Sequence, residues 1–342
     1  MSKPSLSLAL IIICNLFTSS FTYAQRHDFW NINFRKADSI ATVHENRGLK
    51  NPEKLAEDLA MNLTTDVEKF RAIFRWITDN IHYDLNLFNE ISEKQRRFRY
   101  DRKKLLSWQK RFNNKVQRKL YNKQSTICDG YASLLERMSN HVGISCVKIS
   151  GYCRTSDNDI GRGQINHAWN AVKIDTRWYL CDATWASSKL DRATLKFHRR
   201  FDRNYFLTDP SLFIADHFPS DTSWTLLYNK PSLKEFLNSP MKYGEYIASK
   251  VSNYSPKNGI LRIAKGSTVT FEFSCNVDLE KTDSQAHLFI SGAIGKEEIK
   301  KRISQNSNGL YSITHTFENP GAYKVDATIN GKEILTYRVY TK

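Results

Sequence analysis

Residues 124–131 read QSTICDGY, and residues 167–185 read HAWNAVKIDTRWYLCDATW. Apolar side chains follow the first segment at helical spacing: Tyr131, Leu134, Leu135 and Met138. This spacing predicts a buried helix that carries Cys128 in its first turn and ends near Gly143, with Ser125 or Thr126 as its cap.

The position of Cys128 favours a nucleophilic thiolate. The partial positive charge at a helix N-terminus stabilises thiolate over thiol, and the thiolate is the species that attacks an amide carbonyl. Taken alone, the same cysteine also fits the role of a small apolar residue in the core.

The second segment is typical of a β-hairpin. If Asp175 and Thr176 form a two-residue turn, residue 174 faces 177 and residue 169 faces 182. His167 and Asp182 then share one face of the sheet as diagonal neighbours within side-chain reach. The prediction depends on the register, because a one-residue slip would place them on opposite faces. Thr176 is an unfavourable residue for a turn that needs positive φ.

The three side chains together predict a catalytic triad. His167 would accept the proton of Cys128 and pass it to the leaving amine. Asp182 would fix the imidazole tautomer and stabilise the imidazolium. We therefore expect Cys128, His167 and Asp182 to lie together as nucleophile, base and orienting carboxylate.

Other residues are candidates for supporting roles. Backbone N–H groups at the start of the Cys128 helix, with Gln124 as a candidate partner, could stabilise an oxyanion. Trp169 and Trp185 are candidates for cleft walls, with a core position as the alternative for each. The sequence contains no CxxC, no HExxH and no Cys/His cluster at zinc spacing, so we expect no metal centre and no cofactor.

Two helices are predicted upstream. Residues 65–68 (TDVE) read as a capping box, and an apolar face follows it: Phe70, Ile73, Phe74, Ile77 and Ile81. A shorter helix over residues 52–63 begins with Asn51 as its cap and Pro52 in its first turn.

Length and composition indicate a globular protein of two domains. The chain has 342 residues, 40% of them apolar and 25% charged, which excludes collagen-like, disordered and disulfide-knot classes.

Residues 1–24 are typical of a signal peptide, with Lys3, an apolar run over 6–17 and a TYA cleavage site at 22–24. We expect a secreted or periplasmic mature chain without a transmembrane span, since no apolar run reaches about 18 residues.

Five cysteines would remain after cleavage: Cys128, Cys146, Cys153, Cys181 and Cys275. In an oxidising compartment an odd number leaves at least one thiol without an intrachain partner. The apolar surroundings of Cys146, Cys153 and Cys181 are compatible with one disulfide among them.

Most of the net charge lies in one segment. Residues 94–123 hold thirteen basic residues and one acidic residue, Asp101, which gives +12 of the total +16. An apolar stripe predicts one basic amphipathic helix: Leu105, Trp108, Phe112, Val116 and Leu120. It would either attract an anionic surface, such as phospholipid, acidic glycan or nucleic acid, or be a solvated surface helix that packs through its stripe. No DNA- or RNA-binding motif accompanies it, so no specific nucleic-acid partner is expected.

The C-terminal third has a different pattern. Alternating runs occur at 267–274, 287–291, 310–317, 322–329 and 334–340, separated by turn signals. They predict a small antiparallel, immunoglobulin-like β-sandwich that forms an accessory domain over 238–342. Residues 25–237 would then form the catalytic domain.

Several of these segments resemble a known family. CDGYA at 128–132, NHAWN at 166–170, WY at 178–179 and DATW at 182–185 are similar to the signature of transglutaminase-like domains. FRAIFRWITDNIHYD at 70–84, YFLTDP at 205–210 and DHFP at 216–219, with Trp224, resemble the kyphoscoliosis-peptidase-type branch.

The resemblance covers roughly residues 35–240 and implies a papain-like α+β fold, a helix that carries Cys128 against an antiparallel sheet. It assigns the nucleophile to Cys128, the base to His167 and the orienting carboxylate to Asp182. The sequence departs from the family in two places. The basic stretch resembles an insertion, and Thr176 stands where a glycine turn is usual.

Two classes of function follow. The first is a secreted thiol enzyme that acts on peptide or protein amides through a Cys acyl-enzyme. We favour a cysteine peptidase or amidase over a transglutaminase with an amine acceptor, because the sequence shows no amine site and no acidic run like a calcium loop. The second class is a non-catalytic binding or scaffold protein that keeps the fold.

Overall fold

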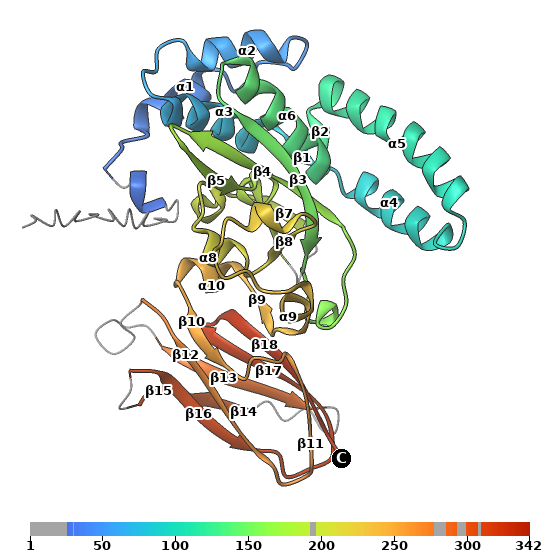
Figure 1. Ribbon diagram of the computed structural model, residues 1–342, viewed down its shortest axis with the longest axis vertical. Helices are drawn as coiled ribbons and strands as arrows, with labels where there is room; N and C mark the ends of the chain where they lie inside the picture. Colours follow the sequence, from blue (N-terminus) through green and yellow to red (C-terminus); the bar gives the residue numbers. More distant parts are fainter. Residues whose placement is uncertain (1–25, 30, 192–195, 277–284, 293–298, 307–308) are drawn as a thin grey trace, which may run out of the picture.

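The computed structural model describes residues 26–29, 31–191, 196–276, 285–292, 299–306 and 309–342. The predicted signal peptide lies outside these residues. Helices and a small sheet form one part of the molecule, and the C-terminal strands form another (Figure 1). Within the described residues, no helix is long and apolar enough to cross a membrane.

A short 3-10 helix (Arg26–Phe29) precedes the first three α-helices: α1 (Arg35–Val43), α2 (Pro52–Ala60) and α3 (Asp66–Asn80). The Asn51 side chain accepts from the Lys54 N–H at 3.0 Å and caps α2, which ends three residues earlier than predicted. Thr65 and Glu68 form the predicted capping box of α3. These polar caps satisfy N–H groups that a helix leaves unpaired at its start.

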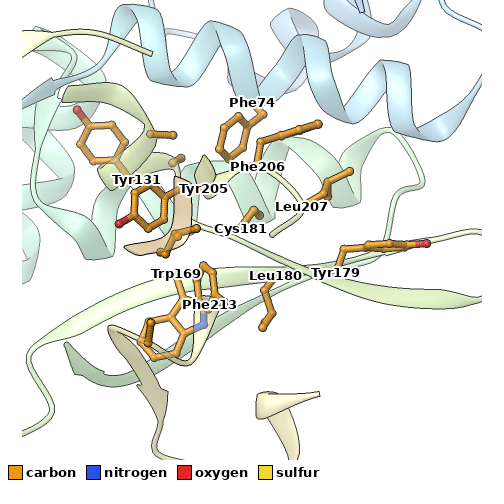
Figure 2. Packing of buried hydrophobic residues seen from close by; sticks show 14 of the residues in the cluster. Phe74, Tyr131, Trp169, Tyr179, Leu180, Cys181, Tyr205, Phe206, Leu207 and Phe213 are labelled. Carbon is orange, nitrogen blue, oxygen red and sulfur yellow. The ribbon is translucent and has the colours of Figure 1, made fainter. Parts of the chain in front are cut away.

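The central sheet has the order β5–β4–β3–β8, with antiparallel neighbours: β3 (Cys146–Cys153), β4 (His167–Ile174), β5 (Arg177–Cys181) and β8 (His217–Pro219). The helix α6 (Cys128–His141) packs on it through the predicted apolar face, and Leu135 and Met138 are fully buried. Figure 2 shows Leu180 and Cys181 on opposite faces of β5, with Trp169 and Phe213 packed below the sheet. Alternation along each strand thus buries both faces.

The hairpin β4–β5 has the predicted register, since Ile174 pairs with Arg177 and Asn170 pairs with Cys181. Asp175 adopts a φ of 53°, so the aspartate rather than Thr176 takes the left-handed conformation. Aspartate tolerates this region better than a β-branched residue does. This is why the turn forms without a glycine.

The predicted cap of the Cys128 helix is wrong. The N-cap of α6 is Ile127, which makes no side-chain hydrogen bond. Ser125 and Thr126 form β2 (Ser125–Thr126), which pairs in parallel with β1 (His82–Tyr83). The backbone of the two candidate caps is therefore used in a strand pair.

The basic segment forms two helices, α4 (Leu85–Arg97) and α5 (Arg102–Lys123), and not the single predicted helix. The helix α4 ends at Arg97. Asp101 then caps α5 by accepting from the Lys104 N–H at 3.0 Å. A small core of its own holds the pair together: Leu87, Trp108, Phe112, Val116 and Ile127. We call residues 85–123 the basic hairpin; it stands out at one side of the molecule (Figure 1).

The C-terminal strands form two sheets. The first has the order β10 (Ser252–Ser255), β12 (Thr268–Ser274), β16 (Tyr311–Thr316) and β15 (Ser304–Gln305). The second has the order β11 (Ile260–Ile263), β18 (Lys332–Thr341), β17 (Gly321–Ile329), β13 (Ala286–Gly292) and β14 (Ile299–Arg302), with β9 (Met241–Lys242) beside β18. The Phe271 and Tyr337 ring centroids lie 5.1 Å apart, so the sheets pack face to face.

The five predicted strands match β12, β13, β16, β17 and β18 to within two residues at each end. The pairs among these five strands are antiparallel, as predicted, whereas β11, which was not predicted, runs parallel to β18. Further short elements are α7 (Ala183–Ser187), β6 (Ser188–Asp191), β7 (Lys196–Arg199), α8 (Pro210–Phe213), α9 (Leu233–Asn238) and α10 (Gly244–Ala248).

Cys146, Cys153 and Cys181 carry free thiols. The expected disulfide among Cys146, Cys153 and Cys181 is therefore absent from this part of the chain. Cys146 and Cys153 lie at opposite ends of β3, and Cys181 lies on β5, with β4 in between. Strand geometry thus keeps these thiols from pairing.

Candidate active site

The fold brings Cys128, His167 and Asp182 together. Cys128 is the first residue of α6, His167 is the first residue of β4, and Asp182 follows β5 directly. His167 Nε2 lies 2.7 Å from Asp182 Oδ2. Cys128 lies near enough to His167 to raise the pKa of its imidazole, and Nδ1 is the ring nitrogen that Asp182 does not use.

Short side chains hold the cysteine helix in place. The Asn170 amide donates to the Ala132 carbonyl at 3.0 Å and ties β4 to α6. Gly130 follows the cysteine by two residues, and a Cβ there would lie 2.0 Å from Thr126 Oγ1. The helix can therefore approach β2 only with glycine at this position.

Asp182 is fully buried and accepts four hydrogen bonds. Its Oδ1 accepts from the backbone N–H groups of Thr184 at 2.7 Å and Trp185 at 3.1 Å. Its Oδ2 accepts from two imidazoles, His167 at 2.7 Å and His217 at 3.0 Å. Burial alone would raise the pKa of this carboxyl, but the two histidines outweigh it and hold the pKa well below its usual range.

His217 is the residue that the sequence argument missed. It is fully buried on β8, and its Nδ1 lies 2.5 Å from Asp216 Oδ1, while Asp216 Oδ2 accepts from the Tyr205 hydroxyl at 2.9 Å. A histidine that donates to carboxylates from both nitrogens is an imidazolium. Burial opposes that charge, but Asp216 and Asp182 raise the pKa of His217. The DHFP motif at 216–219 was its signal in the sequence.

His167 is 9% exposed. Burial lowers the pKa of its imidazole, but the charges of Asp182 and Cys128 outweigh burial and raise the pKa to about 10. An imidazolium beside a cysteine is the arrangement that thiol nucleophiles use.

The start of α6 is open to an oxyanion. Because Ile127 has no polar side chain, no side-chain cap occupies the N–H groups of the first turn. The Gln124 side chain is turned elsewhere, since its amide donates to the Arg47 carbonyl at 3.2 Å. We therefore leave Gln124 out of this site.

The two candidate tryptophans have different environments. Trp169 is almost completely buried and packs against Phe213, with ring centroids 6.0 Å apart, so it is a core residue. Trp185 is half-buried, with its ring centroid 5.6 Å from that of His167 and 4.6 Å from that of His217. Trp169 also borders the histidines, with its ring centroid 6.1 Å from that of His167 and 5.1 Å from that of His217, so what distinguishes Trp185 is its partial exposure to solvent.

His167, Asp182 and His217 offer three ligand-type atoms within 4.8 Å of one another, which is the spacing a metal ion requires. In this structure the same atoms are joined by hydrogen bonds of 2.7 and 3.0 Å. Hydrogen bonding therefore accounts for the grouping without a metal ion.

Comparisons with known proteins agree with this geometry. Residues 53–183 match the family described as the transglutaminase-like superfamily. Kyphoscoliosis peptidase from Mus musculus is 35% identical over 244 residues, which is 70% of this chain and 34% of that protein. The Homo sapiens protein of that name is 35% identical over 247 residues, or 71% and 34%. Hillarin from Drosophila melanogaster is 28% identical over 245 residues, or 64% and 27%.

Residues 53–183 form a domain of the transglutaminase-like superfamily, within a mixed α+β architecture. Within that superfamily, the 35% identity places it on the branch of the kyphoscoliosis peptidases. The chain spans about a third of the length of these curated relatives.

Proposed function

We propose that this protein is a thiol enzyme that cleaves peptide or protein amides through an acyl-enzyme on Cys128. The observation that carries the proposal is the buried Asp182–His167 pair beside a cysteine at an uncapped helix N-terminus. The relatives named as peptidases support hydrolysis.

The geometry suggests a simple sequence of steps. The Cys128 thiolate attacks the amide carbonyl carbon, and first-turn N–H groups of α6 stabilise the oxyanion. His167 gives its proton to the leaving nitrogen, the C–N bond breaks, and a thioester remains. His167 then takes a proton from water, the hydroxide displaces the thioester sulfur, and the acid product leaves with the thiolate–imidazolium pair restored.

Asp182 and His217 would act through His167. Asp182 holds the Nε2 side of the imidazole and thereby directs Nδ1 to Cys128. His217 holds the same carboxylate from the other side. We propose that His217 is a positioning residue that fixes Asp182 and moderates its charge.

Several parts of the prediction remain proposals. We propose secretion after cleavage at Ala24, a catalytic domain over 25–237, and an accessory domain of immunoglobulin-like class over 238–342. A transglutaminase that replaces water with an amine would use the same three residues. A binding or scaffold protein would keep the fold without turnover.

The decisive test is the pH dependence of alkylation by iodoacetamide, with mass-spectrometric assignment of each labelled site. Cys275 serves as an internal reference, because it is the other half-exposed cysteine in the described residues. We expect Cys128 to react at about pH 6, where an ordinary thiol with a pKa near 8.5 is protonated. At that pH Cys128 should react faster than Cys275.

The histidine partner is tested by comparing His167→Ala with His141→Ala, a change at a surface histidine bonded to Glu57. Only the first variant should abolish alkylation at low pH. Peptide hydrolysis and amine incorporation then separate peptidase from transglutaminase. If Cys128 reacts no faster than Cys275, and if its alkylation rate is the same in the parent and in His167→Ala, the enzyme hypothesis is ruled out. The hypothesis of a binding protein is then favoured.

A further inference from the structure

The basic hairpin carries more positive charge than its own acidic residues neutralise. Four of the thirteen basic residues of 94–123 form ion pairs: Lys94 with Glu93, Lys104 with Asp101, Lys115 with Glu90 and Lys119 with Asp84. The pairs at Lys115 and Lys119 join α5 to the α4 side of the hairpin at 2.5 Å each.

Nine basic side chains remain exposed, and none forms an ion pair with another described residue: Arg96, Arg97, Arg99, Arg102, Lys103, Lys110, Arg111, Arg118 and Lys123. Ion pairs thus neutralise four of the thirteen basic side chains, and the other nine positive charges face the solvent.

Four of the nine free charges, at Lys103, Lys110, Arg111 and Arg118, lie on the side of α5 opposite its buried stripe. At 100° per residue, Lys103, Lys110 and Arg118 project away from the buried stripe of Trp108, Phe112 and Val116. The 22 residues of α5 contain no acid and extend over about 33 Å. The result is a long cationic face on α5. The opposite side of the helix is held in place by the core of the hairpin.

Apolar side chains are exposed at the turn of the hairpin. Tyr100 is 88% exposed and Leu106 is 55% exposed. The Arg99 guanidinium lies 4.6 Å from the centroid of the Tyr100 ring. Tyrosine beside arginine is the combination favoured at the interface between lipid headgroups and water. A highly hydrated polyanion would gain little from the exposed Leu106.

We propose that the basic hairpin docks this protein on an anionic phospholipid surface. The α5 face attracts the headgroups, and Tyr100 and Leu106 enter the interface at the turn. Charge complementarity and the apolar turn together favour lipid over an acidic glycan or a nucleic acid. The proposal does not depend on whether Cys128 is catalytic.

The test is co-sedimentation with vesicles of phosphatidylcholine alone or with about one third phosphatidylglycerol. The chain should begin at Gln25, because the apolar run over 6–17 could itself bind lipid. This chain retains every described element. We expect binding only to the anionic vesicles, and release by salt as the charges are screened.

Two variants identify the surface. Lys103→Gln, Lys110→Gln, Arg111→Gln and Arg118→Gln combined should weaken binding by roughly tenfold to a thousandfold. The matched control removes four exposed charges from the C-terminal strands and loops, at Lys257, Arg262, Lys265 and Lys342, and should bind as the parent does. Circular dichroism confirms folding of both.

A double change, Tyr100→Ala with Leu106→Ala, tests the apolar turn at unchanged charge. It should weaken vesicle binding several-fold but leave binding to heparin unchanged. Equal binding to neutral vesicles, equal loss in both charge variants, or no binding at all would overturn the proposal. If the protein binds heparin, and if the double change leaves vesicle binding unchanged, the cationic face is assigned to a soluble polyanion instead.

Discussion

At the scale of single residues, Oδ2 of Asp182 accepts hydrogen bonds from two imidazoles, those of His167 and His217. The His167 and His217 ring centroids are 5.3 Å apart, so a positive charge on one imidazole disfavours protonation of the other. Asp216 supplies the counter-charge that keeps His217 protonated. The charge state of one histidine therefore sets the proton affinity of the other.

We expect His217→Gln to raise the pKa of His167 by about one unit, because glutamine keeps a donor for Asp182 but removes the positive charge. Imidazole NMR titration measures this shift directly, and the alkaline limb of hydrolysis should move to higher pH with it. His141→Gln is the surface control. The double variant Asp216→Asn/His217→Gln, which leaves no uncompensated buried charge, shows whether misfolding causes the change. An unchanged or lower pKa of His167 would contradict the proposed role of His217.

At the scale of elements, Gly151 explains how three strands fit together at the site. It pairs with His167 on β4 and with Pro219 on β8. A Cβ on Gly151 would lie 2.2 Å from the Phe218 carbonyl oxygen and 2.4 Å from the Trp169 ring. The indole fills the space that any other residue would need.

We therefore expect Gly151→Ala to lower the free energy of unfolding by roughly 1–3 kcal/mol, since overpacking shifts strands β3 and β8. Gly48→Ala is the matched control, because a Cβ there meets nothing within 4 Å, and it should change stability by less than about 0.5 kcal/mol. Denaturant titration measures both. Equal stabilities of the two variants would show that the site tolerates the shift.

The sequence predicted the local parts of the site better than the distant ones. His167 and Asp182 flank a two-residue turn, so strand alternation was enough to pair them. His217 reaches the same carboxylate from β8, 35 residues further along the chain, where no local periodicity points to it. Pairing of β2 with β1 overrode the cap preference of Ser125 and Thr126. The break after Arg97 depends on the Asp101 cap, which the apolar spacing does not reveal.

At the scale of the whole molecule, two buried cations lie where the part that contains the central sheet meets the C-terminal strands. Arg154, which follows β3, donates to the Ser239 carbonyl at 2.7 Å and to the Pro240 carbonyl at 3.1 Å. Lys242 on β9 pairs with Leu335 of β18 and is 8% exposed, with its ammonium 4.9 Å from the Tyr254 ring centroid. Burial lowers the pKa of Lys242 to about 7, and Arg154 contributes to the shift.

We expect Lys242→Met to raise the free energy of unfolding by on the order of 1–4 kcal/mol below pH 7. Below pH 7 the lysine is charged in both states, and the folded state bears the full cost of burial. Between pH 7 and about 10.4 the unfolded chain binds more protons, so the stability of the parent protein rises. The gain from methionine should therefore fade over that interval.

Thermal unfolding across this pH range checks the prediction, with Lys265→Met as the control at an exposed lysine. The control should follow the parent at every pH. A methionine variant at 242 that is stabilised equally at low and high pH would show that its packing, and not the buried charge, causes the effect.

The small separate core of the basic hairpin has one more consequence. Leu87, Trp108, Phe112 and Val116 form this core with Ile127, which precedes Cys128 in the chain, while Leu120 at the end of α5 packs in the main core. The exposed face of α5 can therefore change its charge without disturbing the chemistry. A protein built this way can be redirected to a new location while its reaction stays the same, so where it works and what it does are separately adjustable.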